Sequence, residues 1–459
     1  METIRLFLSI VAATAIGWCV LSALTRRSAG EFSVPEKLSI SYGLGLGCVS
    51  LEMLLFYFLN IPFGLLALLL PFVLLFALSV RRGVRPEPGS SGPSGEPEAP
   101  VRLRAIDIFL ISGISFEVLY AFFRALIKPL EAYDAVAIYG IKAKIFYLAG
   151  SIPLDYLGSL RDILPHPDYP LHIPLTETFL YIGMGTLNDQ LVKAIFPLYF
   201  LGLIGLMYCG IRRFAGSRYA LLFTFIMAGI PHLNNYAANG YVDIVLAYYV
   251  FAGYLYLFIW LDRKQDISFL LVSAAMMALA GWTKNEGLVY CASAVLIICI
   301  STLRRSGRPG KAAIKELFSY AGIIAIAALP WLLLKHFLNI QNRETGLEGF
   351  SIQRFFQFGK IRPIAYEFQK EFFNPKKWNI FWPAALIAIA FNLKRAFSAT
   401  RKYMALAVIL AIAGYVIVYF ASPLSTGYLV SKTWNRFLLH FLPVMVYWVA
   451  WILREEFPL

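Results

Sequence analysis

The chain alternates between long apolar runs and short polar connectors. A helix that crosses the hydrocarbon core of a bilayer needs about 20 mainly apolar residues. Runs long enough to approach this begin near residues 4, 38, 62, 106, 190, 219, 243, 268, 287, 317, 381, 403 and 437. The pattern therefore predicts an all-α polytopic membrane protein with about thirteen transmembrane helices.

The basic residues gather in alternate connectors, which predicts the orientation of the helices. The clusters fall within residues 81–104, 212–218, 263–264, 304–315 and 394–402. Each cluster follows an even number of crossings after the first, so the positive-inside rule places all of them in the cytoplasm. Met1 then lies outside and Leu459 inside. Because the first run ends at Arg26 and Arg27 without a small-residue cleavage site, we expect an anchor rather than a signal peptide.

The composition excludes an ordinary soluble enzyme and a disordered protein. Of 459 residues, 59% are hydrophobic and 15% are charged, and the mean hydropathy is +0.67. The net charge of +14 suits nucleic acid, but the positive charges lie in the connectors, where they match anionic lipid, so no nucleic-acid partner is expected. All five cysteines lie in apolar runs, and we expect neither a disulfide nor a metal cluster from them.

Residues 85–104 divide the chain. This stretch is rich in Pro, Gly, Ser and Glu, which predicts a flexible cytoplasmic linker between three N-terminal transmembrane helices (1–84) and a larger module (105–459). The predicted topology leaves two long loops on the outer side, 128–189 and 337–380. Loops of this length usually carry function. Aromatic and basic residues alternate in the second one, which predicts helices lying in the membrane interface.

The first outer loop contains a predicted surface helix over residues 137–149, ended by Gly150. Asp134 lies just before this helix, where a carboxylate either caps the helix or is available for catalysis. Lys142 follows about two helical turns after Asp134, on a similar face. Both interpretations of Asp134 remain open from the spacing alone.

Farther along the same loop, the sequence HPDYP presents His166, Asp168 and Tyr169 in a proline-rich, extended segment. Such a segment serves either as a structural turn or as a ligand-binding surface. His172 follows shortly after it. In the next outer loop, Asn239 precedes Asp243, which begins a descending helix.

A third outer connector, WTKNEG, joins two helices predicted at roughly 268–282 and 287–302. Each would span only about 23 Å, less than the roughly 30 Å of hydrocarbon, so the connector is predicted to lie below the outer interface. Charged residues at that depth either pair with each other or face a polar cavity. Lys284 and Glu286 are therefore either an isolated ion pair or part of a site.

The last outer loop, near 421–436, places Lys432 and Arg436 at the start of the final helix. Lys432 is expected to anchor the helix end at the interface. Arg436 lies one turn deeper and is expected to reach inward.

These motifs, in this order and on this side, resemble the GT-C superfamily of integral membrane glycosyltransferases, specifically the family 39 and aminoarabinose-transferase branch. The resemblance rests on YDAVAIYGIKAK early in the first outer loop, on HPDYP, on GYVDIVLAYY and on WTKNEG, and it covers residues 106–303 best. Asp134 is followed by Ala135, where the protein mannosyltransferases of family 39 carry an Asp-Glu pair.

The resemblance implies a GT-C-like fold and transfer of a sugar from a polyprenyl-phosphate donor to an acceptor hydroxyl, with inversion. It implies Asp134 as the catalytic base, Asp243 as a second acidic residue and Lys284 as a phosphate contact. Some relatives bind a divalent cation, so Mg²⁺ or Mn²⁺ between Asp134 and Asp243 is a further expectation. Lys142 and Arg436 are candidates for additional phosphate contacts. The candidates for substrate binding are His166, Asp168, Tyr169, Glu286 and Asn239.

The expected partners are the lipid-linked donor, a lipid, glycan or protein acceptor, and membrane lipid. The arginine-marked loops favour the bacterial inner membrane, with the site facing the periplasm. Two alternatives remain open. One is a flippase or transporter of a lipid-linked sugar, in which the acidic residues couple to protons. The other is a transferase of the O-antigen-ligase type, which would rely on Arg161, His166 and His172.

Overall fold

The computed structural model consists of helices and connecting loops. It describes residues 1–26, 28–81, 103–159, 166–262, 266–306, 310–340, 353–354 and 357–454. Within these residues there is no β-strand, so the predicted all-α fold is confirmed. Residues 85–102 of the predicted linker and Arg161 lie outside the described residues.

Nine helices in the described residues are long and apolar enough to cross a membrane. They are α1 (Glu2–Leu24), α2 (Val34–Phe58), α4 (Ala105–Leu126), α8 (Ile195–Ala215), α11 (Asp243–Asp262), α13 (Gly287–Ser306), α14 (Lys311–Phe337), α19 (Arg401–Ala421) and α20 (Thr426–Leu453). Four shorter apolar helices coincide with the other predicted runs: α3 (Leu65–Arg81), α9 (Ser217–Ala228), α12 (Ile267–Thr283) and α17 (Phe381–Phe391). These helices support the integral membrane class of the protein. The number of thirteen transmembrane crossings remains a prediction.

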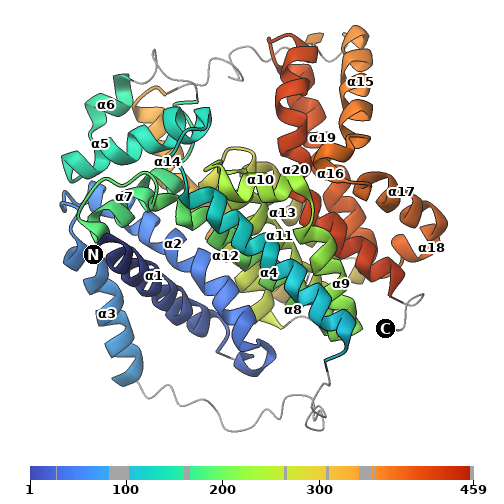
Figure 1. The fold of residues 1–459 in the computed structure, drawn as a ribbon, viewed down its shortest axis with the longest axis horizontal. Coiled ribbons are helices and arrows are strands. Elements are labelled where there is room, and N and C mark those ends of the chain that lie inside the picture. The colour runs from blue at the N-terminus through green and yellow to red at the C-terminus, as the bar shows by residue number, and fades with distance from the viewer. Residues whose placement is uncertain are drawn as a thin grey trace.

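The remaining helices lie between these apolar ones. They are α5 (Ile141–Ala149), α6 (Leu154–Ser159), α7 (His172–Met184), α10 (Pro231–Ala238), α15 (Ile361–Phe372), α16 (Pro375–Trp378), α18 (Leu393–Ala396), the π-helix η2 (Ala135–Gly140) and the 3₁₀ turns η1 (Ala29–Glu31), η4 (Val192–Ala194) and η7 (Phe358–Lys360). Figure 1 shows α5, α6 and α15 in the upper part of the molecule. Both predicted outer loops therefore contain helices.

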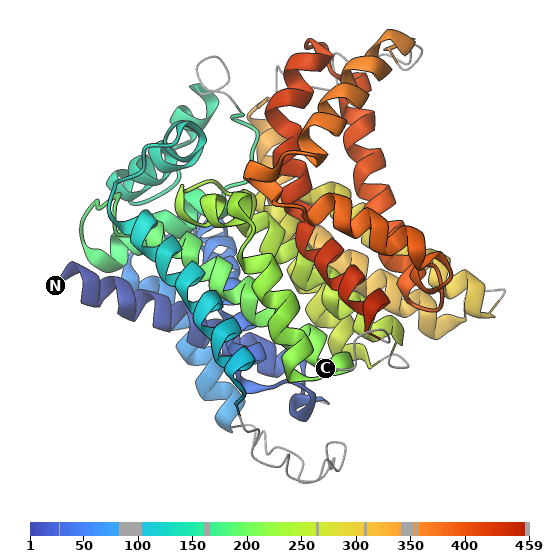
Figure 2. The same ribbon diagram turned by 45° about the vertical axis from the view of Figure 1, so that its right-hand side comes forward.

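Helix α11 forms the centre of the bundle. Its apolar stretch is 100% buried, against 17% for α4 at the periphery. It packs against α8, α12 and α20, and Figure 2 shows it surrounded by other helices. Because α11 is apolar on every side, only a fully enclosed position removes all of its surface from lipid. Asp243 at its first turn is thereby carried into the interior.

The two N-terminal helices α1 and α2 pack tightly against each other. A Cβ atom built on Gly45 would lie 1.7 Å from the Ala13 carbonyl oxygen, so the close approach of the two backbones requires glycine. Helix α2 also packs on α7 and α8, and the Arg213 guanidinium lies 2.7 Å from the Glu36 carboxylate. These helices are therefore joined to the later part of the chain by direct contacts.

Three local predictions need correction. The surface helix predicted over 137–149 begins earlier, as the π-helix η2, and continues as α5 to its left-handed cap at Gly150. Helix α13 has 20 residues rather than about fifteen, so shortness alone does not place the WTKNEG connector below the interface. Helix α20 begins at Thr426, well before its apolar run. Its first turns carry polar residues whose side chains contact other helices, as where the Thr433 hydroxyl lies 3.0 Å from that of Tyr419 on α19.

Candidate active site

The centre of the candidate site is the Asp243 carboxylate, which is completely buried. Oδ1 of Asp243 lies 3.0 Å from the Lys284 ammonium and 2.8 Å from Nε2 of His440. Oδ2 lies 2.9 Å from Nη2 of Arg436, whose Nε lies 3.2 Å from both oxygens. A buried carboxylate requires such compensation, because burial without partners would cost several kcal/mol. Asp243 therefore holds two cations and an imidazole in fixed positions.

The Arg436 guanidinium joins Asp243 to the second predicted carboxylate, that of Asp134. Nη2 of Arg436 lies 2.7 Å from Oδ2 of Asp134, and the Asp134 side chain is 15% exposed. The helix-capping interpretation of Asp134 is not supported, because its side chain makes no capping hydrogen bond to η2. Arg436 reaches inward as predicted, from the third turn of α20.

Lys284 links the Asp243 carboxylate to the WTKNEG connector. Its ammonium lies 3.1 Å from Oε1 of Glu286 in addition to its contact with Asp243, and its side chain is 1% exposed. Burial is the largest influence on the Glu286 carboxyl and raises its pKa, but the Lys284 ammonium, His440 and a backbone hydrogen bond together hold the pKa below its ordinary value. Lys284 and Glu286 are thus not an isolated pair but part of a larger charged cluster.

The HPDYP segment and the WTKNEG connector are cross-linked by two reciprocal hydrogen bonds. The Tyr169 hydroxyl donates to Oε1 of Glu286 at 3.2 Å, and the Asn285 amide donates to Oδ2 of Asp168. The ring of His166 stacks on that of Tyr169, with centroids 4.6 Å apart. Within the described part of the chain, Oδ1 of Asp168 and Oε2 of Glu286 are buried and have no hydrogen-bond partner. These two acceptors are available to the hydroxyl groups of a ligand.

Lys142 lies near this segment and is 1% exposed. Burial lowers the pKa of its ammonium to about 8, although the neighbouring Asp168 carboxylate opposes the shift. Among the described residues no ion pair of Lys142 is found, whereas Lys144 on the same helix pairs with Asp189. Lys142 is therefore a buried cation that lacks a direct counterion within the described part of the chain.

Three other polar residues of the outer loops make contacts of a different kind. Asn239 accepts a hydrogen bond from the backbone of Tyr241 at 2.9 Å, which is a local turn contact. Lys432 is exposed and lies over the ring of Tyr428, as expected for an interface anchor. His172 is fully buried on α7 and contacts neutral hydroxyl groups, so it belongs to the packing of the bundle.

Two residues of the site were missed by the sequence analysis. His440 lies in the apolar run RFLLHFLP, where a single histidine carries no distinctive pattern. Its position one turn after Arg436, on the same face of a helix, is the signal that would have pointed to it. Tyr241 places its ring 5.2 Å from the Arg436 guanidinium carbon, a cation–π contact that fixes the arginine from its other side.

The expected divalent cation can be tested against the side chains. The described residues contain no group of three or more His, Cys, Asp or Glu side chains arranged to hold a metal. The Arg436 guanidinium lies between Asp134 and Asp243, which are the two carboxylates proposed as ligands. A cation that bridged these carboxylates would have to displace Arg436. As the side chains are arranged, the site suits an arginine bridge better than a metal bridge.

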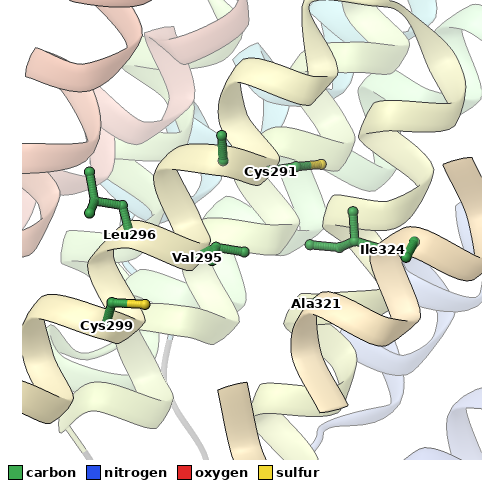
Figure 3. Close-up of a pocket in the computed structure, with 8 residues that line it drawn as sticks. Cys291, Val295, Leu296, Cys299, Ala321 and Ile324 are labelled. Carbon is green, nitrogen blue, oxygen red and sulfur yellow. The ribbon is translucent and has the colours of Figure 1, made fainter. Parts of the chain in front are cut away.

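A separate pocket of about 420 Å³ lies between α13 and α14. Figure 3 shows Cys291, Val295, Leu296 and Cys299 of α13 lining it, with Ala321 and Ile324 of α14 opposite. All five cysteines of the chain are free thiols, including these two. The lining has no charged side chain, so this pocket offers only apolar contact and the chemistry belongs to the Asp243 cluster.

A comparison with known protein families finds a match in the middle of the chain. Residues 166–333 match the family described as Dolichyl-phosphate-mannose-protein mannosyltransferase. The matched stretch is less than half of the chain, and it supports the predicted resemblance to the GT-C superfamily of integral membrane glycosyltransferases. The match includes Asp243, Lys284 and Glu286 but neither Asp134 nor Arg436.

A match to a solved structure is also found. It is the crystal structure of the Archaeoglobus fulgidus oligosaccharyltransferase in the apo form, with a TM-score of 0.41 and 13% sequence identity over 75% of this chain. The aligned part covers 50% of that protein, so this chain spans about half of its length. No curated protein matches the chain at a significant level.

Proposed function

We propose that this protein is a glycosyltransferase that moves a sugar from a polyprenyl-phosphate donor to an acceptor hydroxyl at the outer face of the membrane. The observation that carries the proposal is the arrangement around Asp243. Two cations, Lys284 and Arg436, are held by one buried carboxylate, and the partly exposed Asp134 lies at the edge of the same cluster. This arrangement combines groups that stabilise a phosphate leaving group with a group that can accept a proton.

The donor phosphate binds to Arg436, Lys284 and Lys142. Lys142 suits this role because it is buried, lies near Asp168 and has no counterion among the described residues. A phosphate that takes over the contact with Arg436 also frees Asp134, which is ion-paired with that guanidinium at 2.7 Å. Donor binding therefore prepares Asp134 to act as a base. The sugar hydroxyls donate hydrogen bonds to Oδ1 of Asp168 and Oε2 of Glu286, which are buried and have no partner among the residues that the structure describes.

The reaction is a single displacement. Asp134 removes the proton of the acceptor hydroxyl while the oxygen forms a bond to the anomeric carbon of the sugar. The bond from that carbon to the phosphate oxygen breaks, and its electron pair leaves with the polyprenyl phosphate, whose growing charge Lys284 and Arg436 stabilise. Because the acceptor attacks opposite the phosphate, the configuration at the anomeric carbon is inverted. A general base of this kind contributes about 10²–10⁴ in rate.

The location follows from the charges of the connectors. With the basic connectors in the cytoplasm, the Asp243 cluster faces the outside, and in a bacterial inner membrane this is the periplasm. A lipid-linked donor reaches such a site from the outer leaflet. The acceptor is a lipid, glycan or protein hydroxyl available on the same side.

The test is sugar transfer by purified protein. The protein is incubated with a panel of radiolabelled polyprenyl-phosphate monosaccharides and total membrane lipid, and Asp134→Asn is compared with the wild type. We expect Asp134→Asn to lose at least about 100-fold in turnover and to retain donor binding. The matched control is Asp189→Asn, which removes a carboxylate paired with Lys144 outside the cluster and should leave turnover intact.

Two outcomes would contradict the proposal. Near-normal turnover of Asp134→Asn would remove the assigned base. Donor binding by the wild type without turnover in any acceptor fraction would argue for a flippase of lipid-linked sugars instead.

A further inference from the structure

A chain of buried hydrogen bonds leads from the Asp243 cluster into the helix bundle. Nε2 of His440 contacts Oδ1 of Asp243 at 2.8 Å, and Nδ1 of His440 contacts the Tyr415 hydroxyl at 3.1 Å. The Tyr415 hydroxyl in turn contacts the Tyr290 hydroxyl at 2.7 Å. The four residues come from α11, α20, α19 and α13, and all of them are buried. The chain therefore connects the site to the packing of four separate helices.

The direction of these hydrogen bonds follows from the groups themselves. An ionised carboxylate only accepts, so Nε2 of His440 carries the proton that is donated to Asp243. In the neutral imidazole, Nδ1 then has a lone pair and accepts from the Tyr415 hydroxyl. The oxygen of Tyr415 accepts from Tyr290, which completes a chain in which every hydroxyl proton has an acceptor. The opposite direction would leave the Tyr290 proton without an acceptor among the contacts of the described residues.

This chain adds a restraint on the Asp243 carboxylate to those of Lys284 and Arg436. Without His440, the carboxylate would still attract Lys284 and Arg436, but it could rotate toward either cation. The imidazole occupies a third position on Oδ1, and the rings behind it are rigidly packed, with Tyr415 stacked on Phe437 at a centroid distance of 3.7 Å. Side chains locked by such contacts place the groups they bind more precisely than free side chains do.

We propose that His440 and Tyr415 are positioning residues, which hold Asp243 so that Lys284 and Arg436 are set at a fixed separation for the donor phosphate. This inference rests on the proposed function, because it assigns those two cations to the phosphate. Neither His440 nor Tyr415 touches the substrate. Their effect reaches the reaction through Asp243 and the cations it holds.

The structure supplies a matched pair of tyrosines for the test. Tyr415 and Tyr419 lie one turn apart on α19, both near the Phe437 ring. The Tyr419 hydroxyl contacts Thr433 at 3.0 Å rather than His440. Tyr415→Phe and Tyr419→Phe thus remove the same atom from the same helix, but only the first breaks the chain to Asp243.

The experiment compares five proteins, namely the wild type, His440→Phe, His440→Gln, Tyr415→Phe and Tyr419→Phe. Two readouts are used: turnover with the donor panel, and the Kd for undecaprenyl phosphate without a sugar. Both values refer to folded protein, and the thermal unfolding midpoint of each variant shows that it is folded at the assay temperature. We expect His440→Phe to lose about tenfold in both readouts, the effect of one hydrogen bond to a charged group. His440→Gln, whose amide retains a donor, should recover most of that loss.

For the tyrosines, we expect Tyr415→Phe to lose about threefold and Tyr419→Phe to match the wild type. Positioning is overturned if His440→Phe equals the wild type in both readouts, or if His440→Gln is as impaired as His440→Phe at an equal unfolding midpoint. It is also overturned if the two tyrosine variants behave alike. A wild type that binds undecaprenyl phosphate without turnover would instead contradict the proposed transferase, and the Kd values would still decide the role of His440.

Discussion

Two buried histidines, His172 and His440, both contact tyrosine hydroxyls, but only His440 also contacts a charged group. His172 on α7 contacts Ser50 at 2.8 Å and Tyr249 at 3.1 Å, and all of its polar neighbours are neutral. His440 on α20 contacts a tyrosine in the same way, but its other nitrogen binds the buried carboxylate of Asp243. A neutral network of this kind stabilises the packing of helices, whereas an ionic one holds charges in place at a cost in desolvation.

The comparison also separates the two motifs that carry these residues. His172 follows the proline-rich HPDYP segment, where function was expected, and proves to be a packing residue. His440 lies in an apolar run and proves to touch the site. For these two histidines, the charge of the neighbouring groups in space therefore separates their roles, and the motif that each one follows does not.

The largest expected effect comes from removing the ionic centre. Asp243→Ala leaves Lys284 and Arg436 buried beside an empty carboxylate position. We expect the free energy of unfolding to fall by about 3–5 kcal/mol, because breaking a buried ion pair leaves uncompensated charge. Thermal unfolding in detergent measures this. Asp262→Ala at the other end of the same helix is the control, and an equal loss there would deny the special role of the Asp243 cluster.

The next effect concerns the bridge between the two carboxylates. Arg436→Lys keeps the charge but removes the planar group that contacts both Asp134 and Asp243. We expect turnover to fall by about 10²–10³, as for loss of one preorganised donor in other enzymes. Steady-state kinetics with the donor panel gives this value. Lys432→Ala, an exposed cation on the same helix, should change turnover by less than about twofold.

The neutral network provides the contrasting case. His172→Phe leaves the hydroxyls of Ser50 and Tyr249 without one of their partners, so we expect a loss of about 1–3 kcal/mol in the free energy of unfolding. Turnover per folded molecule should remain that of the wild type. A fall in turnover without a change in the unfolding midpoint would show that the two histidines are more alike than their contacts indicate.

The smallest effect is a dependence of donor binding on pH. The ammonium of Lys142 predominates below its pKa of about 8, and the neutral amine predominates above it. A donor phosphodiester keeps its negative charge across this range, so the attraction is present below pH 8 and is lost as the pH rises through that value. We expect Kd for the donor to rise several-fold, up to about tenfold, between roughly pH 7 and pH 9.

The control for this titration is on the same helix. Lys142→Met should bind the donor weakly and without the pH dependence, whereas Lys144→Met, which removes the partner of Asp189, should keep it. An unchanged pH profile in Lys142→Met would place the titrating group elsewhere.

Much of the candidate site was predictable residue by residue. Asp134, Asp243, Lys284 and Arg436 were expected on one side of the membrane, and the structure brings all four into one cluster. Charged residues beside apolar runs are conspicuous in a sequence, because their burial requires a reason. Asn239 was grouped with the substrate-binding candidates, and this stays a prediction; the contact the structure shows for its Oδ1 is a local turn contact.

The limits of the sequence are clearest at α20. The apolar run begins near residue 437, so the polar residues before it were assigned to a loop. They are helical nonetheless, and Arg436 finds a partner in Asp243 on another helix, which hydropathy along one segment does not register.

The sequence by itself determined the all-α membrane class and the apolar helices, because hydrophobic periodicity is a local property that each segment carries alone. It also identified charged residues next to apolar runs, whose burial in the membrane would require a partner or a polar cavity. Only the tertiary structure decided which carboxylate meets which cation. Asp243 and Arg436 are separated by 193 positions, and their contact depends on the register at which α11 and α20 pack. That register is set by side-chain packing along the whole length of both helices, and no local pattern contains it.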